Sequence, residues 1–325
     1  MDAMPSLPPP VAALLPLAMF VALALDLAFG EPPAWAHPVV AIGRYLALCG
    51  PRLLRLAPRP ALVGGALLWA FGAAGCVALA WGVERAVYAG LQPWHSSARL
   101  LGAALLVGVC LKPLFAWRML RDEAAAVEAA LVRVSVDAAR ARLARLVSRD
   151  TAALDAPAIR EAAIETLAEN LNDSVVAPLF WFALAGLPGA ALYRFANTAD
   201  AMWGYRGRWE WAGKFAARAD DLLSWLPARL TGLALMGACT LRPRDLRRLA
   251  AEAARTPSPN SGWPMAAVAL RLGARLGKPG VYLLNAAGAP PQADSLERAQ
   301  RLARAALWRV VPLLAGFALL ARWPR

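Results

Sequence analysis

The residues best suited to chemistry are four carboxylates at a strict four-residue spacing, namely Glu161, Glu165, Glu169 and Asp173. On a helix this spacing stacks the four side chains on one face, where like charges repel. Residues 161–193 contain no Lys or Arg that could relieve the repulsion. This acidic row therefore predicts a cation from elsewhere: a distant arginine, a substrate ammonium group, or a hard metal ion that prefers oxygen ligands. A solvated acidic helix face is the alternative.

The acidic row runs directly into an apolar segment. Asp155 followed by Pro157 predicts the start of the helix that carries the row. Residues 174–193, which follow the row, are uncharged and apolar, whereas the whole chain has a net charge of +13. Because solvated carboxylates rarely adjoin a hydrophobic, membrane-associated segment, we expect the chemistry at this junction.

Another polar cluster lies at the end of the first apolar run, where Asp26 is followed by Glu31 and His37. An ionisable residue inside a membrane span is a functional candidate, because burying a charge in a bilayer is costly. The alternative is an aspartate that caps the helix end at the membrane interface. We predict that Asp26 and His37 contribute to substrate binding.

Two more polar strings follow the acidic row. Asn197 and Asp200 are three residues apart, and Asp220 is adjacent to Asp221. The cations around the second pair are Lys214, Arg218 and Arg229. Such a set suits magnesium and phosphate, because carboxylate and amide oxygens hold the ion while Arg and Lys bind phosphate oxygens. The predicted magnesium ligands are Glu169, Asp173 and Asp200.

Standard nucleotide-binding motifs are absent from the sequence. The nearest string to a Walker A loop is GARLGKPG at residues 273–280, which has the wrong spacing and a proline where Ser or Thr should stand. A GxGxxG string is also missing. The residues alone therefore predict a membrane protein with a non-standard cytoplasmic site for a polyanion and a metal ion.

The composition predicts an integral membrane protein, since 59% of the residues are hydrophobic and the mean hydropathy is +0.45. Four runs approach the roughly 20 residues that a helix needs to span a bilayer. These clear spans are expected near residues 11–29, 62–83, 100–117 and 305–321. Two further apolar segments, 174–193 and 222–241, contain Pro and either Gly or Arg. We expect broken or re-entrant helices there, which a bilayer permits only where protein buries their backbone.

The expected fold is all-α and polytopic, with residues 1–325 forming one membrane domain. Its sections are three spans in 1–117, a cytoplasm-facing helical region with the site motifs in 118–304, and a final span in 305–325. Arginines in the loop after the first span indicate that this loop is cytoplasmic. Because the positive charges flank apolar spans, nucleic-acid binding is not expected. With two histidines and four scattered cysteines, neither a histidine-rich metal site nor a zinc set is expected.

Several strings together resemble the adenosylcobinamide-phosphate synthases of the CobD/CbiB family, which are bacterial and archaeal inner-membrane proteins of cobalamin biosynthesis. The match starts with DLAFGEPPAWAHPVVAIGR at Asp26 and SRDTAALD at Ser148, and continues with the block from Glu161 to Arg206. WAGKFAARADDLLSWLPARLT and SPNSGWPMAAVALRLGARL follow in the family's order. The resemblance covers most of the chain.

The resemblance implies an ATP-dependent ligase that joins aminopropanol, or its phosphate, to a carboxyl side chain of adenosylcobyric acid through an amide. ATP would be a co-substrate with Mg²⁺, and the partners would be these substrates, membrane lipid and other late cobalamin-pathway enzymes. The implied catalytic residues are Glu165, Glu169, Asn170, Asp173 and Asp200. The implied substrate-binding residues are Asp26, His37, Arg149, Asp150, Asn197, Lys214, Arg218, Asp220, Asp221, Arg229 and Asn260. A membrane regulator of the AmpE type and a transporter are the alternatives.

Overall fold

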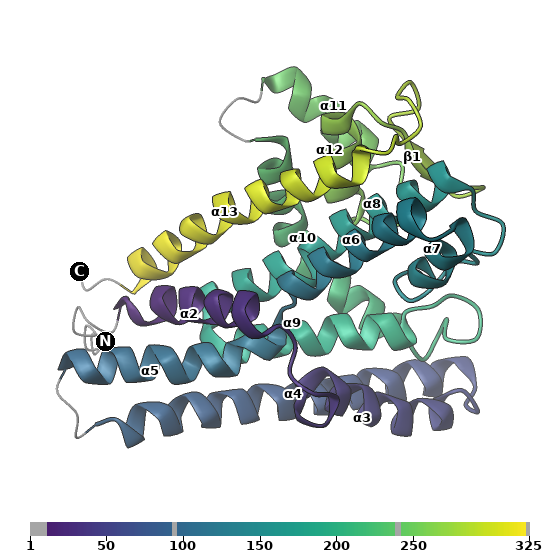
Figure 1. The fold of residues 1–325 in the computed structure, drawn as a ribbon. Coiled ribbons are helices and arrows are strands. Elements are labelled where there is room, and N and C mark those ends of the chain that lie inside the picture. Colours follow the sequence, from purple (N-terminus) through teal and green to yellow (C-terminus); the bar gives the residue numbers. More distant parts are fainter. Residues whose placement is uncertain (1–11, 93–95, 238–241, 323–325) are drawn as a thin grey trace. The chain divides into compact units, whose positions relative to one another are not determined.

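The computed structural model describes residues 12–92, 96–237 and 242–322, which are predominantly helical (Figure 1). This confirms the all-α prediction. The helices are α2 (Leu14–Phe29), α3 (Pro38–Leu53), α4 (Pro58–Gly90), α5 (Ser96–Leu111), α6 (Trp117–Arg133), α7 (Val136–Leu143), α8 (Ala156–Leu171), α9 (Ala177–Trp203), α10 (Lys214–Met236), α11 (Pro243–Ala253), α12 (Gly262–Leu272) and α13 (Ser295–Ala321). A π-helix, η3 (Asn172–Val176), joins α8 to α9, and the 3₁₀ turns are η1 (Ala34–Ala36) and η2 (Lys112–Leu114).

One short hairpin was not expected from the sequence. The strands β1 (Leu276–Lys278) and β2 (Tyr282–Leu284) pair antiparallel. In the connecting turn Val281 N–H donates to Lys278 O at 2.9 Å, and Gly280 has a φ of 72°. Pro at the second turn position and a positive-φ Gly at the third are the signature of a type II turn. The hairpin packs against α8 and α12.

Four stretches of the described chain are long and apolar enough to cross a membrane, namely Pro58–Gly90, Ser97–Arg133, Ala156–Trp203 and Ser295–Ala321. They confirm the prediction of a polytopic membrane protein. Three of them contain the spans expected at 62–83, 100–117 and 305–321. The stretch Ala156–Trp203 contains both the acidic row and the apolar segment after it.

The first expected span, residues 11–29, is shorter than predicted, and residue 11 lies outside the described residues. Helix α2 has 16 residues, which corresponds to about 24 Å against a hydrocarbon core of roughly 30 Å. It ends at Gly30, whose φ is 68° and whose N–H donates to Asp26 O at 3.0 Å. Pro32 and Pro33 follow and cannot continue a helix. A full-length span is therefore not found among the described residues of this segment.

The chain forms two compact units, each built from non-contiguous segments. Unit 1 draws on residues 1–116, 177–223 and 311–325, and unit 2 on 117–176 and 224–310. In unit 1, α4 packs along α9 and α2 along α5, whereas in unit 2, α8 packs against α6, α7 and α12. The expected cytoplasm-facing region therefore divides, because residues 177–223 belong with the N-terminal helices. That the whole chain acts as one membrane domain stays a prediction.

Helix α9 is broken inside the apolar segment 174–193, as the sequence predicts. Ala185 has a φ of −134° and Gly186 a φ of 67°, which glycine adopts without the strain of a Cβ atom. Pro188 follows and lacks the N–H needed to continue the helical ladder. Backbone groups freed by such a break must find partners within the protein if the segment lies in a bilayer.

Two charged side chains of unit 1 satisfy the groups freed by this break. Arg322 donates from Nη1 to Ala183 O at 3.1 Å and from Nη2 to Leu184 O at 3.2 Å. Glu84 on α4 accepts the N–H of Leu187 at 2.9 Å. A cation at the end of the first half and an anion at the start of the second also match the two helix dipoles. Together they stabilise the break, and no local sequence pattern points to either residue.

A proline lies within α10, the other segment (222–241) expected to be bent or partly inserted. Pro227 cannot donate to Leu223 O, four residues earlier, and that carbonyl instead accepts Trp181 Nε1–H at 2.9 Å. Residues 238–241 lie outside the described residues. Partial insertion of this segment stays a prediction.

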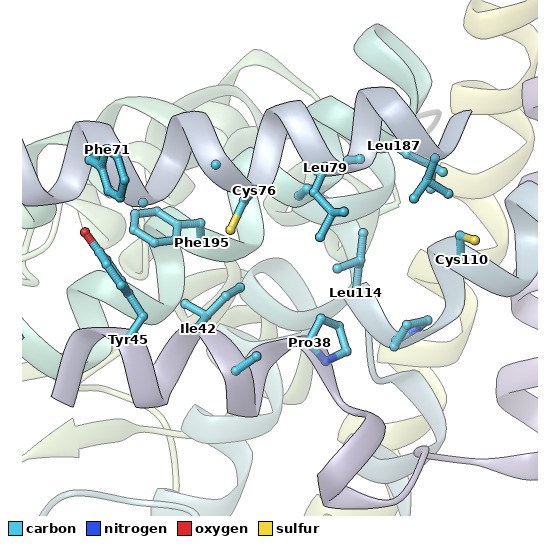
Figure 2. Close-up of a pocket in the computed structure, with 17 residues that line it drawn as sticks. Pro38, Ile42, Tyr45, Phe71, Cys76, Leu79, Cys110, Leu114, Leu187 and Phe195 are labelled. Carbon is cyan, nitrogen blue, oxygen red and sulfur yellow. The ribbon is translucent and has the colours of Figure 1, made fainter. Parts of the chain in front are cut away.

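An apolar cavity of about 570 Å³ lies within unit 1 between α3, α4 and α9 (Figure 2). Phe71 and Phe195 line it, together with Tyr45, whose hydroxyl donates to Leu68 O at 2.7 Å. None of its lining residues is charged. This cavity therefore lacks the groups for carboxylate or phosphate chemistry, and the candidate site lies elsewhere.

Candidate functional site

Helix α8 begins where the sequence predicts, and its start sets the face on which the acidic row lies. The Asp155 side chain accepts the N–H of Ala158 at 3.0 Å, and Pro157 occupies the first turn. Three carboxylates of the row lie on α8, and Asp173 lies on the following π-helix η3. Single π-helical turns are rare and frequently mark functional sites.

The central carboxylate of the row is buried against an arginine from the loop between α7 and α8. Arg149 Nη2 donates to Glu165 Oε2 at 2.5 Å, and the Glu165 side chain is only 2% exposed. Glu165 Oε1 is also buried and accepts no hydrogen bond from the described residues at normal geometry. The solvated-face interpretation is therefore wrong for Glu165, and a distant arginine is one source of the predicted cation.

The hairpin brings further positive charge to the row. Glu161 lies within electrostatic range of Arg149 and Arg275, and Glu169 lies within range of Arg149 and Lys278. Arg275 and Lys278 belong to the string GARLGKPG, which does not match a Walker A loop. Two cations within four residues, next to a Pro-Gly turn, were the signal that could have found them.

Tyr282 on β2 adds a neutral hydroxyl beside these charges. Burial, and then the nearby Glu165 carboxylate, raise the pKa of Tyr282, so the phenol stays protonated at neutral pH. A protonated phenol can donate a hydrogen bond to an anion. No sequence motif singles out this tyrosine.

Amide side chains fix the π-helix and the last turn of α8. Asn172 Nδ2 donates to Asp173 Oδ1 at 2.7 Å, while Thr231 Oγ1 donates to Asn172 Oδ1 at 3.1 Å. Asn170, a predicted catalytic residue, donates to Thr166 O at 3.1 Å and accepts from Ser174 Oγ at 3.1 Å. These bonds hold the Asp173 carboxylate in place. A catalytic role for Asn170 stays a prediction.

No group of three or more His, Cys, Asp or Glu side chains is arranged to hold a metal ion within the described part of the chain. Glu169 and Asp173 lie in unit 2 and influence each other electrostatically, whereas Asp200 lies in unit 1. Because these residues belong to different units, the joint binding of magnesium by Glu169, Asp173 and Asp200 stays a prediction. Within unit 2, two neighbouring carboxylates and the buried Glu165 Oε1 are donors of the kind that a hard cation prefers.

Unit 1 brings together the two polar strings that follow the acidic row. Asn197 Nδ2 donates to Asp220 Oδ1 at 3.5 Å, and Asp200 lies within electrostatic range of Asp221. Burial raises the pKa of Asp221, and Arg218 at 3.8 Å opposes that shift. Helices α9 and α10 therefore gather three carboxylates and an amide that sequence reasoning had assigned to one site.

Three of the predicted substrate-binding residues are partly or fully exposed to solvent in their own units, namely Lys214, Arg218 and Asp150. Lys214 pairs with Glu210 at 3.6 Å and lies 4.4 Å from the centre of the Trp211 ring. The Arg218 side chain is 77% exposed. Asp150, also exposed, accepts Ala152 N–H at 2.9 Å and closes a local turn. Their substrate-binding roles stay predictions.

The N-terminal cluster of unit 1 contains a cation, Lys112, that is not among the predicted site residues. Lys112 Nζ lies 3.2 Å from Asp26 Oδ1 and 2.7 Å from Glu31 Oε1, and His37 Nε2 lies 3.0 Å from Glu31 Oε2. The Asp26 side chain is fully buried, which excludes an exposed interfacial cap. His37 Nδ1 accepts Val39 N–H and thereby caps α3. A lone lysine in an apolar run was the available signal.

Arg229 is held by aromatic rings in unit 2. Its guanidinium lies 4.4 Å from the centre of the Trp225 ring and 5.0 Å from that of Trp263. Nη1 donates to Asn260 Oδ1 at 2.8 Å. The structure thus joins two predicted substrate-binding residues, Arg229 and Asn260, and shows that Arg229 also supports the packing of unit 2.

Comparison with known proteins gives one consistent result. Residues 19–309 match the family model described as CobD/Cbib protein. A cobalamin biosynthesis protein CobD of Rhodobacter capsulatus is 39% identical over 308 residues, covering 89% of this chain and 93% of the relative. A probable cobalamin biosynthesis protein CobD of Pyrococcus abyssi is 41% identical, covering 86% of this chain and 88% of the relative.

A relative of the same name from Thermococcus kodakarensis is 39% identical over 300 residues, covering 92% of each chain. No solved structure matches the chain significantly. The family match extends over the acidic row, the broken helix and the hairpin, so all the clusters described above lie inside it. The chain belongs to the CobD/CbiB protein family.

Proposed function

We propose that this protein carries out an amide-forming step of cobalamin biosynthesis in the bacterial inner membrane. ATP would activate a carboxyl side chain of adenosylcobyric acid, and the amine of aminopropanol or its phosphate would then attack it. In the activation step a carboxylate oxygen attacks a phosphorus atom of ATP, and ADP or pyrophosphate leaves. The amine nitrogen then attacks the activated carbonyl carbon and loses a proton, and the oxygen departs as part of phosphate or AMP. The names of the curated relatives support the cobalamin part of the proposal.

The observation that carries the proposal is the juxtaposition of opposite charges in unit 2. The acidic row on α8 and η3 faces cations from the Arg149 loop and the hairpin. Amide synthesis with ATP must hold a carboxylate and phosphates, which repel one another, and cations next to them offset that repulsion. Magnesium, if held by Glu169 and Asp173, would neutralise phosphate charge. The row would also attract the ammonium group of the incoming amine.

The test is whether purified protein in lipid nanodiscs makes the amide. We expect ATP consumption and a new amide, detected by mass spectrometry, only when Mg²⁺, adenosylcobyric acid and the amino alcohol phosphate are all present. A variant carrying both Glu169→Gln and Asp173→Asn serves as the inactive control. ATP hydrolysis that ignores both substrates, or the absence of any product, would contradict the proposal and favour a regulator or a transporter.

A further inference from the structure

A cavity of about 530 Å³ lies beside the β1–β2 hairpin within unit 2. Its charged lining is Arg149, Glu161, Arg275 and Lys278. The volume falls within the roughly 300–1,000 Å³ of pockets that bind small molecules. Three cations against one carboxylate distinguish it from the apolar cavity of unit 1, and they suit an anionic ligand.

Two of these cations are outside direct ion pairs. Arg149 pairs with the buried Glu165. Arg275 and Lys278 lie within electrostatic range of Glu161 and Glu169, but neither forms an ion pair within 4 Å in the described part of the chain. Cations that line one cavity without paired anions repel each other, and a bound anion offsets that repulsion. Tyr282, whose phenol stays protonated beside Glu165, also lines this cavity.

Another part of the lining is apolar. Leu154 precedes α8, and Val281 and Leu283 belong to the hairpin. A ligand that fits both parts carries phosphate at one end and a larger, less polar group at the other. A nucleoside triphosphate has both, whereas an amino alcohol phosphate has the charge but no group to cover the apolar side.

We propose that this cavity binds a nucleoside triphosphate, with its phosphates against Arg149, Arg275 and Lys278 and its nucleoside against the apolar lining. The choice of nucleotide rests on the proposed ATP-dependent function. The hairpin string GARLGKPG then contributes to phosphate binding through its cations, without the backbone loop of a Walker A motif.

Binding of the non-hydrolysable analogue β,γ-imido-ATP with Mg²⁺ to the full-length protein in nanodiscs tests the proposal. Arg275→Ala and Lys278→Ala each remove a cation that lines the cavity, so each should weaken binding roughly tenfold or more. Ala158→Trp fills the cavity without removing a charge and should abolish binding. Arg247→Ala, at an exposed position on α11 away from the cavity, is the matched control and should bind like the wild type. Thermal unfolding of each variant checks that it is folded.

Competition identifies the source of the phosphate. Inorganic tripolyphosphate should displace the analogue, and aminopropanol phosphate should not. The proposal is overturned if the wild type fails to bind the analogue, if folded Arg275→Ala and Lys278→Ala both bind it as tightly as the wild type, or if aminopropanol phosphate displaces it. Binding that needs Lys278 without any amide synthesis would leave this site standing while the proposed function fails. If the protein makes the amide with ATP but these variants bind the analogue normally, the proposed function stands and this nucleotide site is wrong.

Discussion

Arg149 and Glu165 form a 2.5 Å hydrogen-bonded ion pair that fastens the loop before α8 to the middle of that helix. The Glu165 side chain is 2% exposed and that of Arg149 is 17% exposed. The pair relieves part of the repulsion along the acidic row. Its position also orders the loop that contributes Arg149 to the basic cavity.

Breaking this pair from the arginine side should be costly. Arg149→Ala leaves Glu165 buried without a counter-charge, so we expect a loss of about 3–5 kcal/mol in unfolding free energy. Adding Glu165→Gln to that variant should recover part of the loss, because the uncompensated charge disappears. Denaturant unfolding in detergent measures both. A loss below about 1 kcal/mol for Arg149→Ala would show that the pair contributes little.

Neutralising the two C-terminal carboxylates of the acidic row should lower enzymatic activity without lowering stability. Glu169→Gln and Asp173→Asn should each lower the rate of amide synthesis about 10²–10³-fold, by analogy with the loss of other electrostatic groups. Apo stability should hold or rise, because carboxylate repulsion is relieved. Glu297→Gln, at an exposed position on α13, should change neither quantity. Rates of amide synthesis close to the wild type for both variants would show that the acidic row has a structural role and no catalytic one.

The two arginines of α10 should respond differently to alanine. Arg229 lies between two Trp rings and bonds Asn260, so Arg229→Ala should cost about 2 kcal/mol or more of stability. Arg229→Lys should not restore it, because lysine lacks the planar fork. The exposed Arg218→Ala should keep stability and raise the KM for a phosphorylated substrate. Thermal unfolding and steady-state kinetics check both; equal stability of the two alanine variants would contradict the assignment.

The break in α9 should depend on Glu84. Glu84→Ala leaves the Leu187 N–H without its acceptor and should cost about 1–3 kcal/mol, whereas Glu84→Gln keeps an acceptor and should cost less. Gly186→Ala should also destabilise, because φ is 67° and a Cβ atom would lie 2.6 Å from Glu84 Oε2. Thermal unfolding in one detergent compares the three. Equal melting temperatures for Glu84→Ala and the wild type would refute this role.

Acid should lower the stability contributed by the N-terminal cluster of unit 1, in which Glu31 contacts Lys112 and His37. Burial alone would raise the pKa of Glu31, but hydrogen bonds from His37 and Lys112, with their charges, hold it below its usual 4.5. The unfolded state therefore binds the proton first as pH falls. The stabilisation is present above about pH 4.5 and is lost as pH falls through the folded pKa. Glu31→Gln should flatten this part of a stability–pH curve, and an unchanged slope would contradict the prediction.

The sequence by itself determined the features that obey local rules. Asp155 and Pro157 start α8, because capping acts within a few residues of the helix end. Gly186 and Pro188 break α9, because their own backbones disfavour a continuous helix. The length and apolarity of the runs determined the membrane class. Even the need for a cation near the acidic row followed from its spacing.

Tertiary structure decided which distant groups meet these local features. Lys112 reaches Glu31 from 81 residues away, and Glu84 caps a helix half that begins 103 residues later. The hairpin that carries Lys278 was missed because three-residue strands have too little alternation to register as a pattern. The spacing of like charges along a chain predicts that they need an oppositely charged partner, but it does not say which residue that partner is. Only packing selects the partner, because an ion pair depends on distance in space and not on separation in sequence.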